Sequence, residues 1–218
     1  MGISLRLLGH ASFQISASGK VIYIDLKKYG KVVEPSEKAG IVLVTHGHAD
    51  HCSPDKIIEI QKDDTVIIAP ENCSKRINGD VISLKPGEET VIGGIKIRAV
   101  EAYNHRRFKP SGKPWHPRGY GVGYLIKVGD KTIYHAGDTD LIPEMKKLGL
   151  IDVALLPTGD KYTMDNVEAA EASLLIKPKV AIPMHTWEKD PKEFKERVEA
   201  NSDIKVVLLE LGEEFHMN

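Results

Sequence analysis

Cysteine is scarce in this sequence, since only Cys52 and Cys73 occur among 218 residues. The two could pair with each other, but they cannot build the multiple-disulfide framework of a small secreted protein. The simpler expectation is that both are reduced in the cytoplasm. Long apolar runs are also missing, because none reaches the roughly 18 residues that a membrane-spanning helix needs. The N-terminal stretch lacks the basic and apolar regions of a signal peptide, so we expect a soluble cytoplasmic protein.

Neither sign of charge dominates. The chain has 30 basic and 31 acidic residues and a formal net charge of -1, which argues against non-specific nucleic-acid binding. The length allows a sizeable core and favours one large domain over two small ones. We found no linker and no low-complexity segment, so we predict a single domain over residues 1–218. The sequence does not predict an oligomeric state.

Strand-like runs recur along the chain, rich in Val, Ile and Tyr and bounded by Gly, Asp and Pro. Helical patterns alternate with some of these runs, so we expect a layered domain of the α/β or mixed α+β class. Ser53 with Pro54, and Asp165 with Glu168, are N-terminal helix signals. Further helices are expected at 139–149 and 192–201. The strand-like runs are 3–8, 20–25, 41–45, 65–69, 95–100, 120–128, 131–136, 153–157, 179–184 and 204–211.

One internal similarity suggests two related halves. GKVIYIDL (19–26) and DKTIYHAGD (130–138) each contain a turn, an apolar strand and then an aspartate. Each is followed by a second strand, a Gly-containing loop and a helix. The similarity is short, so it is suggestive of a duplication in which each half presents polar residues from loops at strand ends.

Histidine is concentrated in one place. The chain has nine histidines, and three of them fall within six residues of the segment IVLVTHGHADHCSPDKI (41–57). A buried strand here leads into a tight loop, which Gly47 and Ala49 allow to fold closely. Imidazole and carboxylate are ligands that suit Zn, Fe or Mn. The clustered candidates are His46, His48, Asp50 and His51.

Four side chains from so short a loop cannot all reach one ion with good geometry, so the pattern predicts two ions completed by ligands from elsewhere. Asp138 in YHAGDTD and His185 in VAIPMHTW both follow predicted strands. His105 and His116 lie in the loop 104–119. These four residues are the candidate remaining ligands.

THGHADH resembles the HxHxDH signature of the metallo-β-lactamase superfamily, and GDT at 137–139 resembles its bridging-aspartate motif. The resemblance extends from GHASF (9–13) to the last strand. It is greatest to small single-domain metal-dependent hydrolases similar to ascorbate-6-phosphate lactonases and, more distantly, to N-acylphosphatidylethanolamine phospholipase D. The resemblance implies an α+β fold, a four-layer αββα sandwich with the site at one edge.

The resemblance also implies a role for each ligand. His46 and His48 would bind a first metal ion, Asp50 and His51 would bind a second together with His185, and Asp138 would bridge the two. The last ligand of the first ion is either His105, which follows a strand as in many relatives, or His116. We favour His116, because its HPRG context resembles that of the subgroup most similar to this chain.

Other polar residues are open to two interpretations. His10 could line the site or be structural, and Asp25 could hold a ligand histidine through a hydrogen bond or simply end a strand. His135 is expected to pack, and Cys52 to be a free buried cysteine rather than a ligand. His216 is expected to be exposed.

The implied reaction is hydrolysis by a metal-bridging hydroxide, with two divalent ions, most simply Zn and alternatively Mn or Fe, and with Asp50 orienting the nucleophile. His48 stands where relatives with iron-based redox chemistry carry Glu, which favours hydrolysis. Five basic residues and no acid in loop 104–119 predict a positive patch that would attract a small anionic ester, lactone or phosphodiester. A solvated basic loop is the alternative interpretation. Other functions left open are a nuclease and a catalytically silent metal-binding module.

Further contacts around the loop are also open. Trp115 could stack on a substrate ring or pack the loop down. Thr163 and Met164 are expected to border the cleft.

Overall fold

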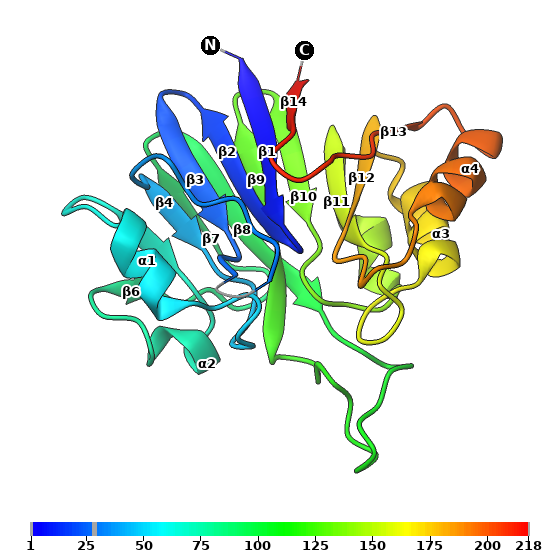
Figure 1. Ribbon diagram of the computed structural model, residues 1–218, viewed down its shortest axis with the longest axis horizontal. Coiled ribbons are helices and arrows are strands. Elements are labelled where there is room, and N and C mark those ends of the chain that lie inside the picture. The colour runs from blue at the N-terminus through cyan, green and yellow to red at the C-terminus, as the bar shows by residue number, and fades with distance from the viewer. Residues whose placement is uncertain (1, 28–29, 218) are drawn as a thin grey trace. The chain divides into compact units, whose positions relative to one another are not determined.

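The computed structural model describes residues 2–27 and 30–217, which divide into two compact units. Unit 1 comprises the described residues of Met1–Leu84 and Leu209–Asn218, and unit 2 comprises Lys85–Leu208. Each unit contains one seven-stranded mixed sheet (Figure 1). No helix within the described ranges is long and apolar enough to cross a membrane.

The sheet of unit 1 combines antiparallel and parallel pairing. β14, β1, β2 and β3 pair antiparallel, and β3, β4, β5 and β6 pair parallel. β4 and most of β5 are buried, as expected for the centre of a sheet covered by helices, whereas β6 at the sheet edge is partly exposed. In sheet order the strands are β14 (Glu214–Met217), β1 (Ile3–Gly9), β2 (Ser12–Ala17), β3 (Lys20–Ile24), β4 (Ile41–Leu43), β5 (Val66–Ile68) and β6 (Val81–Ile82).

The sheet of unit 2 follows the same plan. β7, β8, β9 and β10 pair antiparallel, and β10, β11, β12 and β13 pair parallel. The two sheets therefore share one order of strand pairings, which supports the two-halves interpretation of the internal similarity. The strands are β7 (Glu89–Ile92), β8 (Ile95–Ala102), β9 (Gly121–Val128), β10 (Lys131–His135), β11 (Val153–Pro157), β12 (Val180–Met184) and β13 (Lys205–Val206).

The helices begin where the capping signals predicted. The Ser53 side chain accepts a hydrogen bond from the backbone of Lys56, and Asp165 and Glu168 form a complete capping box. The segment 139–149 forms only a short 3₁₀ turn. The helices are α1 (Pro54–Ile60), α2 (Glu71–Ser74), η1 (Pro143–Lys147), α3 (Asn166–Ile176) and α4 (Lys192–Ala200).

Several short elements were not predicted. β2, β6, β7, β14 and α2 were missed, and only Lys205 and Val206 of the run 204–211 form a strand. β6, β7, β13 and β14 are short and lie at or next to the sheet edges, where pairing rather than local composition decides the structure. The other strand-like runs all contain a strand.

Each unit has its own apolar core. In unit 1, Ile57 and Ile60 of α1 pack with Val42 and Ile67 of the sheet. In unit 2, Phe194 and Val198 of α4 are fully buried, as are several alanines of α3. Burial of one such large side chain stabilises the fold by about 1.5–3 kcal/mol. These cores fix the parallel strands, and the candidate site residues follow the carboxyl ends of those strands.

Candidate active site

Asp25 organises the histidine-rich loop of unit 1. It directly follows β3 and is fully buried. Its carboxylate accepts hydrogen bonds from the Thr45 backbone at 2.7 Å and the Thr45 hydroxyl at 2.6 Å, and lies 2.8 Å from Nδ1 of His51. The structure therefore gives Asp25 the supporting contact that the sequence analysis left open. A carboxylate on Nδ1 places the proton there and leaves Nε2 of His51 as a potential ligand atom.

The other loop histidines of unit 1 also converge. Nε2 of His46 lies 3.1 Å from Nδ1 of His48. Nε2 of His10 lies 3.2 Å from the Asp50 carboxylate, and ligand atoms of His10, Asp50 and His51 lie within 4.8 Å of one another. The structure thus adds His10 to the polar cluster around Asp50.

Tight packing fixes the loop backbone. A Cβ atom at Gly47 would lie 2.8 Å from the carbonyl and side-chain oxygens of Asn72, so only glycine fits without a shift. Arg76 donates a hydrogen bond to the Gly47 carbonyl at 2.6 Å. Gly47 therefore has the role that the sequence pattern predicted.

The prediction of two free cysteines is wrong. Cys52 and Cys73 form a disulfide that joins the end of the histidine loop to α2. Their Cα atoms are 6.4 Å apart, within the usual range for a disulfide. This pairing could not be predicted from the sequence, because Cys73 lies in α2, a four-residue helix without a side-chain cap that would mark its start. The bond constrains the residue next to His51.

Asp138 is the centre of the corresponding cluster in unit 2. It follows β10 and is nearly buried, with one carboxylate oxygen 3.3 Å from Nε2 of His116 and 3.2 Å from Nε2 of His185. His185 follows β12 and has a positive φ of 52°. Two imidazoles and one carboxylate are thus gathered within unit 2, from segments far apart in the sequence.

Asn104 orients His116. Its side-chain oxygen lies 2.7 Å from Nδ1 of His116 and accepts the His116 backbone N–H at 2.9 Å. Nε2 is then the nitrogen that faces Asp138. His105, by contrast, is 43% exposed at its side chain, and its ring lies 3.9 Å from Asp140. The geometry of unit 2 favours His116 over His105.

Carboxylates compensate the positive patch that the basic loop predicted. Arg106 pairs with Glu168, and Arg107 pairs with Asp140, Asp160 and Glu168. Arg118 pairs with two further glutamates, Glu101 and Glu144, so three arginines meet five carboxylates. The acids come from other segments, which is why the loop sequence alone suggested an excess of positive charge.

These ion pairs perturb the acids within them. Burial by itself raises the pKa of Glu168, but the Arg107 guanidinium outweighs this and holds the pKa below its ordinary value. Asp140 is fully buried, and its pKa is lowered because the backbone N–H groups of Arg106 and His105 and the Arg107 guanidinium outweigh desolvation. The loop is therefore anchored by ionised carboxylates.

Three other residues occupy packed positions. Trp115 packs edge-on against Tyr162 at a ring separation of 4.7 Å, which corresponds to the loop-packing alternative. Thr163 and Met164 are fully buried rather than bordering an open cleft. His135 is also buried, and its Nδ1 accepts the Gly137 N–H, in agreement with the packed role expected for it. His216 lies exposed on β14, as expected.

Sequence reasoning missed the supporting residues Thr45, Asn104 and Asp140. Thr45 directly precedes His46, and Asn104 directly precedes His105. Asp140 is the second acid of GDTD. That position beside a ligand motif was the available signal. Glu168 was recognised only as a cap, because its second role depends on arginines about 60 residues away.

Comparison with known proteins decides the family. A model of the β-lactamase superfamily domain matches residues 4–185. The chain belongs to the β-lactamase superfamily. A metal-dependent hydrolase of the UPF0173 group from Pelotomaculum thermopropionicum is 35% identical over 99% of this chain and 100% of its own length. A relative from Archaeoglobus fulgidus, also described as a UPF0173 metal-dependent hydrolase, has the same identity and coverage.

Solved structures agree with this assignment. A protein of Parabacteroides distasonis assigned to the metal-dependent hydrolases superposes with a TM-score of 0.87 at 35% identity, over 94% of this chain and 92% of its own. Igni18, a metallo hydrolase from Ignicoccus hospitalis, superposes with a TM-score of 0.81 at 26% identity. The match covers 100% of this chain and 99% of Igni18. The resemblance seen in THGHADH, the metallo-β-lactamase fold class and the expectation of a metal-dependent hydrolase are therefore confirmed.

The residues present fit a metal of this class. Each unit contributes imidazole and carboxylate groups, the donor set that suits Zn, Mn or Fe. The supporting contacts of Asp25 and Asn104 are those that commonly orient ligand histidines.

Proposed function

We propose that this enzyme uses two divalent metal ions to hydrolyse a small anionic ester, lactone or phosphodiester. The observation that carries the proposal is the contact of Asp138 with both His116 and His185 at 3.2–3.3 Å. A buried carboxylate between two imidazoles is an arrangement expected of a shared metal ligand. Zn is the simplest choice for this donor set, with Mn and Fe as alternatives.

The proposed ligand roles follow the superfamily resemblance. His46, His48 and His116 would hold the first ion, and Asp138 would be shared with the second. The remaining ligands of the second ion are Asp50, His51 and His185.

Bound divalent ions would supply an activated water as nucleophile and stabilise the developing negative charge. The protein's own residues then have separate tasks. Asp25 keeps the His51 proton on Nδ1, and Asn104 does the same for His116. Asp50, which contacts His10 at 3.2 Å, would orient the nucleophile by accepting a hydrogen bond from it.

The proposed preference for an anionic substrate depends on two lysines of loop 104–119, because carboxylates already pair with the three arginines of this loop. Lys113 stays without an ion-pair partner among the described residues, and Lys109 lies over the Trp115 ring at 5.4 Å. The pairing of the three loop arginines with carboxylates argues against repeated contacts to a phosphate backbone, and so against a nuclease. The buried hydrogen bonds that orient His51 and His116 argue against a silent module. The cytoplasmic location is part of the same proposal.

Metal titration of the chelator-stripped protein tests the first half of this proposal. We expect saturation at two equivalents of Zn per chain by isothermal titration and by elemental analysis. Saturation at one equivalent would contradict the dinuclear centre.

A substrate panel tests the second half. Carboxylate-bearing esters, lactones, phosphodiesters and their neutral counterparts should be assayed with Zn, Mn and Fe. We expect higher kcat/KM for the anionic member of each pair. Equal rates for the charged and neutral members would remove the anionic preference while leaving the hydrolase class intact.

A further inference from the structure

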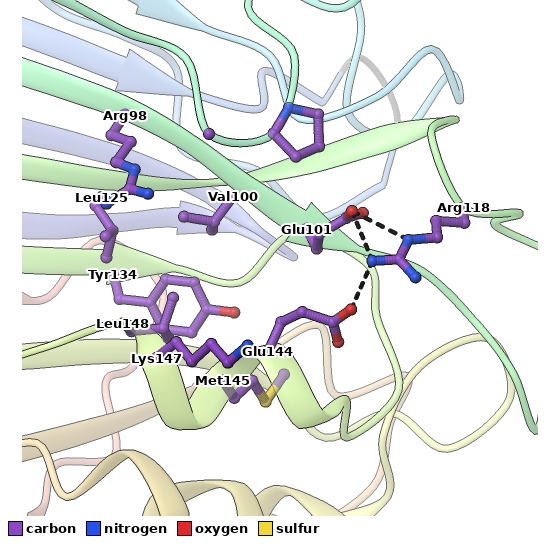
Figure 2. A pocket seen from close by; sticks show the side chains of 12 residues that line it. Arg98, Val100, Glu101, Arg118, Leu125, Tyr134, Glu144, Met145, Lys147 and Leu148 are labelled. Atoms are coloured by element: carbon purple, nitrogen blue, oxygen red, sulfur yellow. Dashed lines mark hydrogen bonds and ion pairs between the residues drawn. The ribbon is translucent and has the colours of Figure 1, made fainter.

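A cavity of about 260 Å³ lies within unit 2, away from every proposed metal ligand (Figure 2). Its walls come from β8, β9, β10, η1 and the turn at Pro86 and Gly87. This volume is slightly below the ~300–1,000 Å³ of typical small-molecule sites, so it suits a ligand smaller than a drug. None of the functions discussed above uses this cavity.

One side of the cavity is built by the sheet. Arg98, Leu125 and Tyr134 are directly opposite one another on three adjacent strands, so their side chains share one face. Val100 lies two residues from Arg98 on that same face. The rest of the lining combines the apolar residues Pro86, Met145 and Leu148 with charged side chains.

Two buried polar atoms along this cavity have no hydrogen-bond partner among the residues that the structure describes. The Tyr134 side chain is fully buried, and its hydroxyl forms no hydrogen bond within the described parts of the chain. Oε2 of Glu101 is likewise buried without a partner there. Figure 2 shows the Tyr134 hydroxyl pointing toward the side that carries Glu101 and Glu144. Buried polar groups are normally hydrogen-bonded, so these two atoms indicate groups that a ligand would supply.

The two atoms require opposite hydrogen-bonding groups on a ligand. Oε2 of Glu101 can accept a hydrogen bond from a ligand, since Oε1 of the same carboxylate already accepts one from Arg118 at 2.9 Å. The Tyr134 hydroxyl stays protonated, since burial raises its pKa, and it can donate. A ligand therefore needs a donor for Glu101 and an acceptor for Tyr134.

The charges along the lining add a third requirement. Arg118 is shared between Glu101 and Glu144 and is thereby neutralised. Arg98 and Lys147 have no carboxylate partner among the residues that the structure describes, and both are exposed. Two unpaired cations beside an apolar wall favour a ligand with one anionic group.

We propose that this cavity binds a small apolar α-amino acid. Its ammonium group donates to Glu101, and its carboxylate accepts from Tyr134 and faces Arg98 and Lys147. Its apolar side chain packs against Leu125 and neighbouring apolar groups. The cavity is then a ligand site separate from the hydrolytic centre.

Three matched probes test the chemistry in titrations of the ¹⁵N-labelled full-length protein, followed by NMR chemical shifts. L-leucine has both charged groups, isocaproate lacks the ammonium, and isopentylamine lacks the carboxylate. We expect leucine to bind at least about tenfold more tightly than either analogue, with shifts confined to the cavity lining. Equal affinities for the three probes, or no shifts in the lining at the solubility limit, would overturn the proposal.

Variants separate binding from folding. Tyr134→Phe should keep or raise the melting temperature, because it removes a buried hydroxyl without a protein partner, yet weaken leucine binding about threefold to tenfold. Tyr23→Phe is the matched control, since the Tyr23 hydroxyl donates to the Glu37 carbonyl in unit 1. It should lower the melting temperature and leave binding unchanged.

A second variant keeps the test decisive. Leu148→Trp should fill the cavity and abolish the leucine-induced shifts. Unchanged leucine affinity in both Tyr134→Phe and Leu148→Trp would show that binding occurs elsewhere and would overturn the assignment.

Discussion

Asp25 and His51 form a fully buried carboxylate–imidazole pair, with 2.8 Å between Oδ2 and Nδ1. The same carboxylate accepts two hydrogen bonds from Thr45, which directly precedes His46. One aspartate therefore holds both ends of the segment that contains the HGHADH residues. Its influence on metal binding should be large for a residue that is not itself a proposed ligand.

Asp25→Asn should weaken Zn binding by about 10–100-fold, the usual cost of losing such a supporting contact. The amide oxygen can replace only one of the two carboxylate oxygens, so the NH₂ group would face either the Thr45 backbone N–H or the His51 N–H. Competition with a fluorescent chelator measures the affinity. Asp63→Asn, at an exposed position, is the control and should behave as wild type. An unchanged affinity in Asp25→Asn would remove this supporting role.

Asp138→Ala should reduce turnover by more than about 100-fold and lower the affinity for both metal ions, because one carboxylate serves both. The control is His135→Ala, which removes a buried imidazole three residues earlier and should change metal content much less. Inductively coupled plasma analysis and steady-state kinetics check both variants. Near wild-type turnover with full metal content in Asp138→Ala would make the bridging role wrong.

His116→Ala should lose more metal affinity than His105→Ala. The buried His116 ring is oriented by Asn104, whereas the His105 ring is 43% exposed. Asn104→Ala should show an intermediate loss, because it frees the His116 ring without deleting it. Metal titration of the three variants gives the ranking, and a reversed order for the two histidines would transfer the ligand role to His105.

Glu168→Gln should destabilise the protein in a pH-dependent way. The folded-state pKa of Glu168 lies below its ordinary value of 4.5, since Arg107 and Arg106 outweigh the effect of burial. The folded protein thus binds fewer protons at this site than the unfolded chain. The contribution of ionised Glu168 to the free energy of unfolding is complete above about pH 4.5. It is lost as the pH falls through the folded-state pKa.

Urea unfolding measures this effect. At pH 7 we expect a loss of about 1–3 kcal/mol in the free energy of unfolding for Glu168→Gln, shrinking toward zero in acid. Glu171→Gln, an exposed site on the same helix, should cost little at any pH. A loss that stays constant down to acid pH would show that the ion pairs are not its cause.

Reduction of the Cys52–Cys73 disulfide should lower stability by about 3 kcal/mol, because the bond closes a loop between residues 21 apart in sequence. Urea unfolding with and without a phosphine reductant measures this difference, and the Cys52→Ala/Cys73→Ala variant should be insensitive to reductant. A thiol assay under denaturing conditions should find no free thiol before reduction. Two free thiols in the purified protein would contradict the disulfide and favour the reduced state first expected.

The sequence was sufficient where one local pattern carries the information. THGHADH identified the loop of His46 to His51, and the capping signals at Ser53 and Asp165 located two helices. It was insufficient where partners come from distant segments. The arginines of loop 104–119 looked unopposed because Asp140, Glu168 and their other partners lie elsewhere in the chain. Cys73 likewise stands in a helix too short to be recognised from composition.

Three candidate site residues, His10, Asp25 and His185, have left-handed backbone conformations with φ between 52° and 54°. For a residue other than glycine this conformation costs about 1–3 kcal/mol. Glycine at any of the three would relax the backbone while deleting the functional side chain. At Asp25 the buried hydrogen bonds with Thr45 and His51 offset this strain, so selection for thermal endurance would retain the aspartate. At His10 and His185 the same selection would drift toward glycine, whereas selection for turnover would retain the strained residue. Laboratory evolution for thermal endurance should accordingly exchange catalysis for stability at His10 and His185 but not at Asp25.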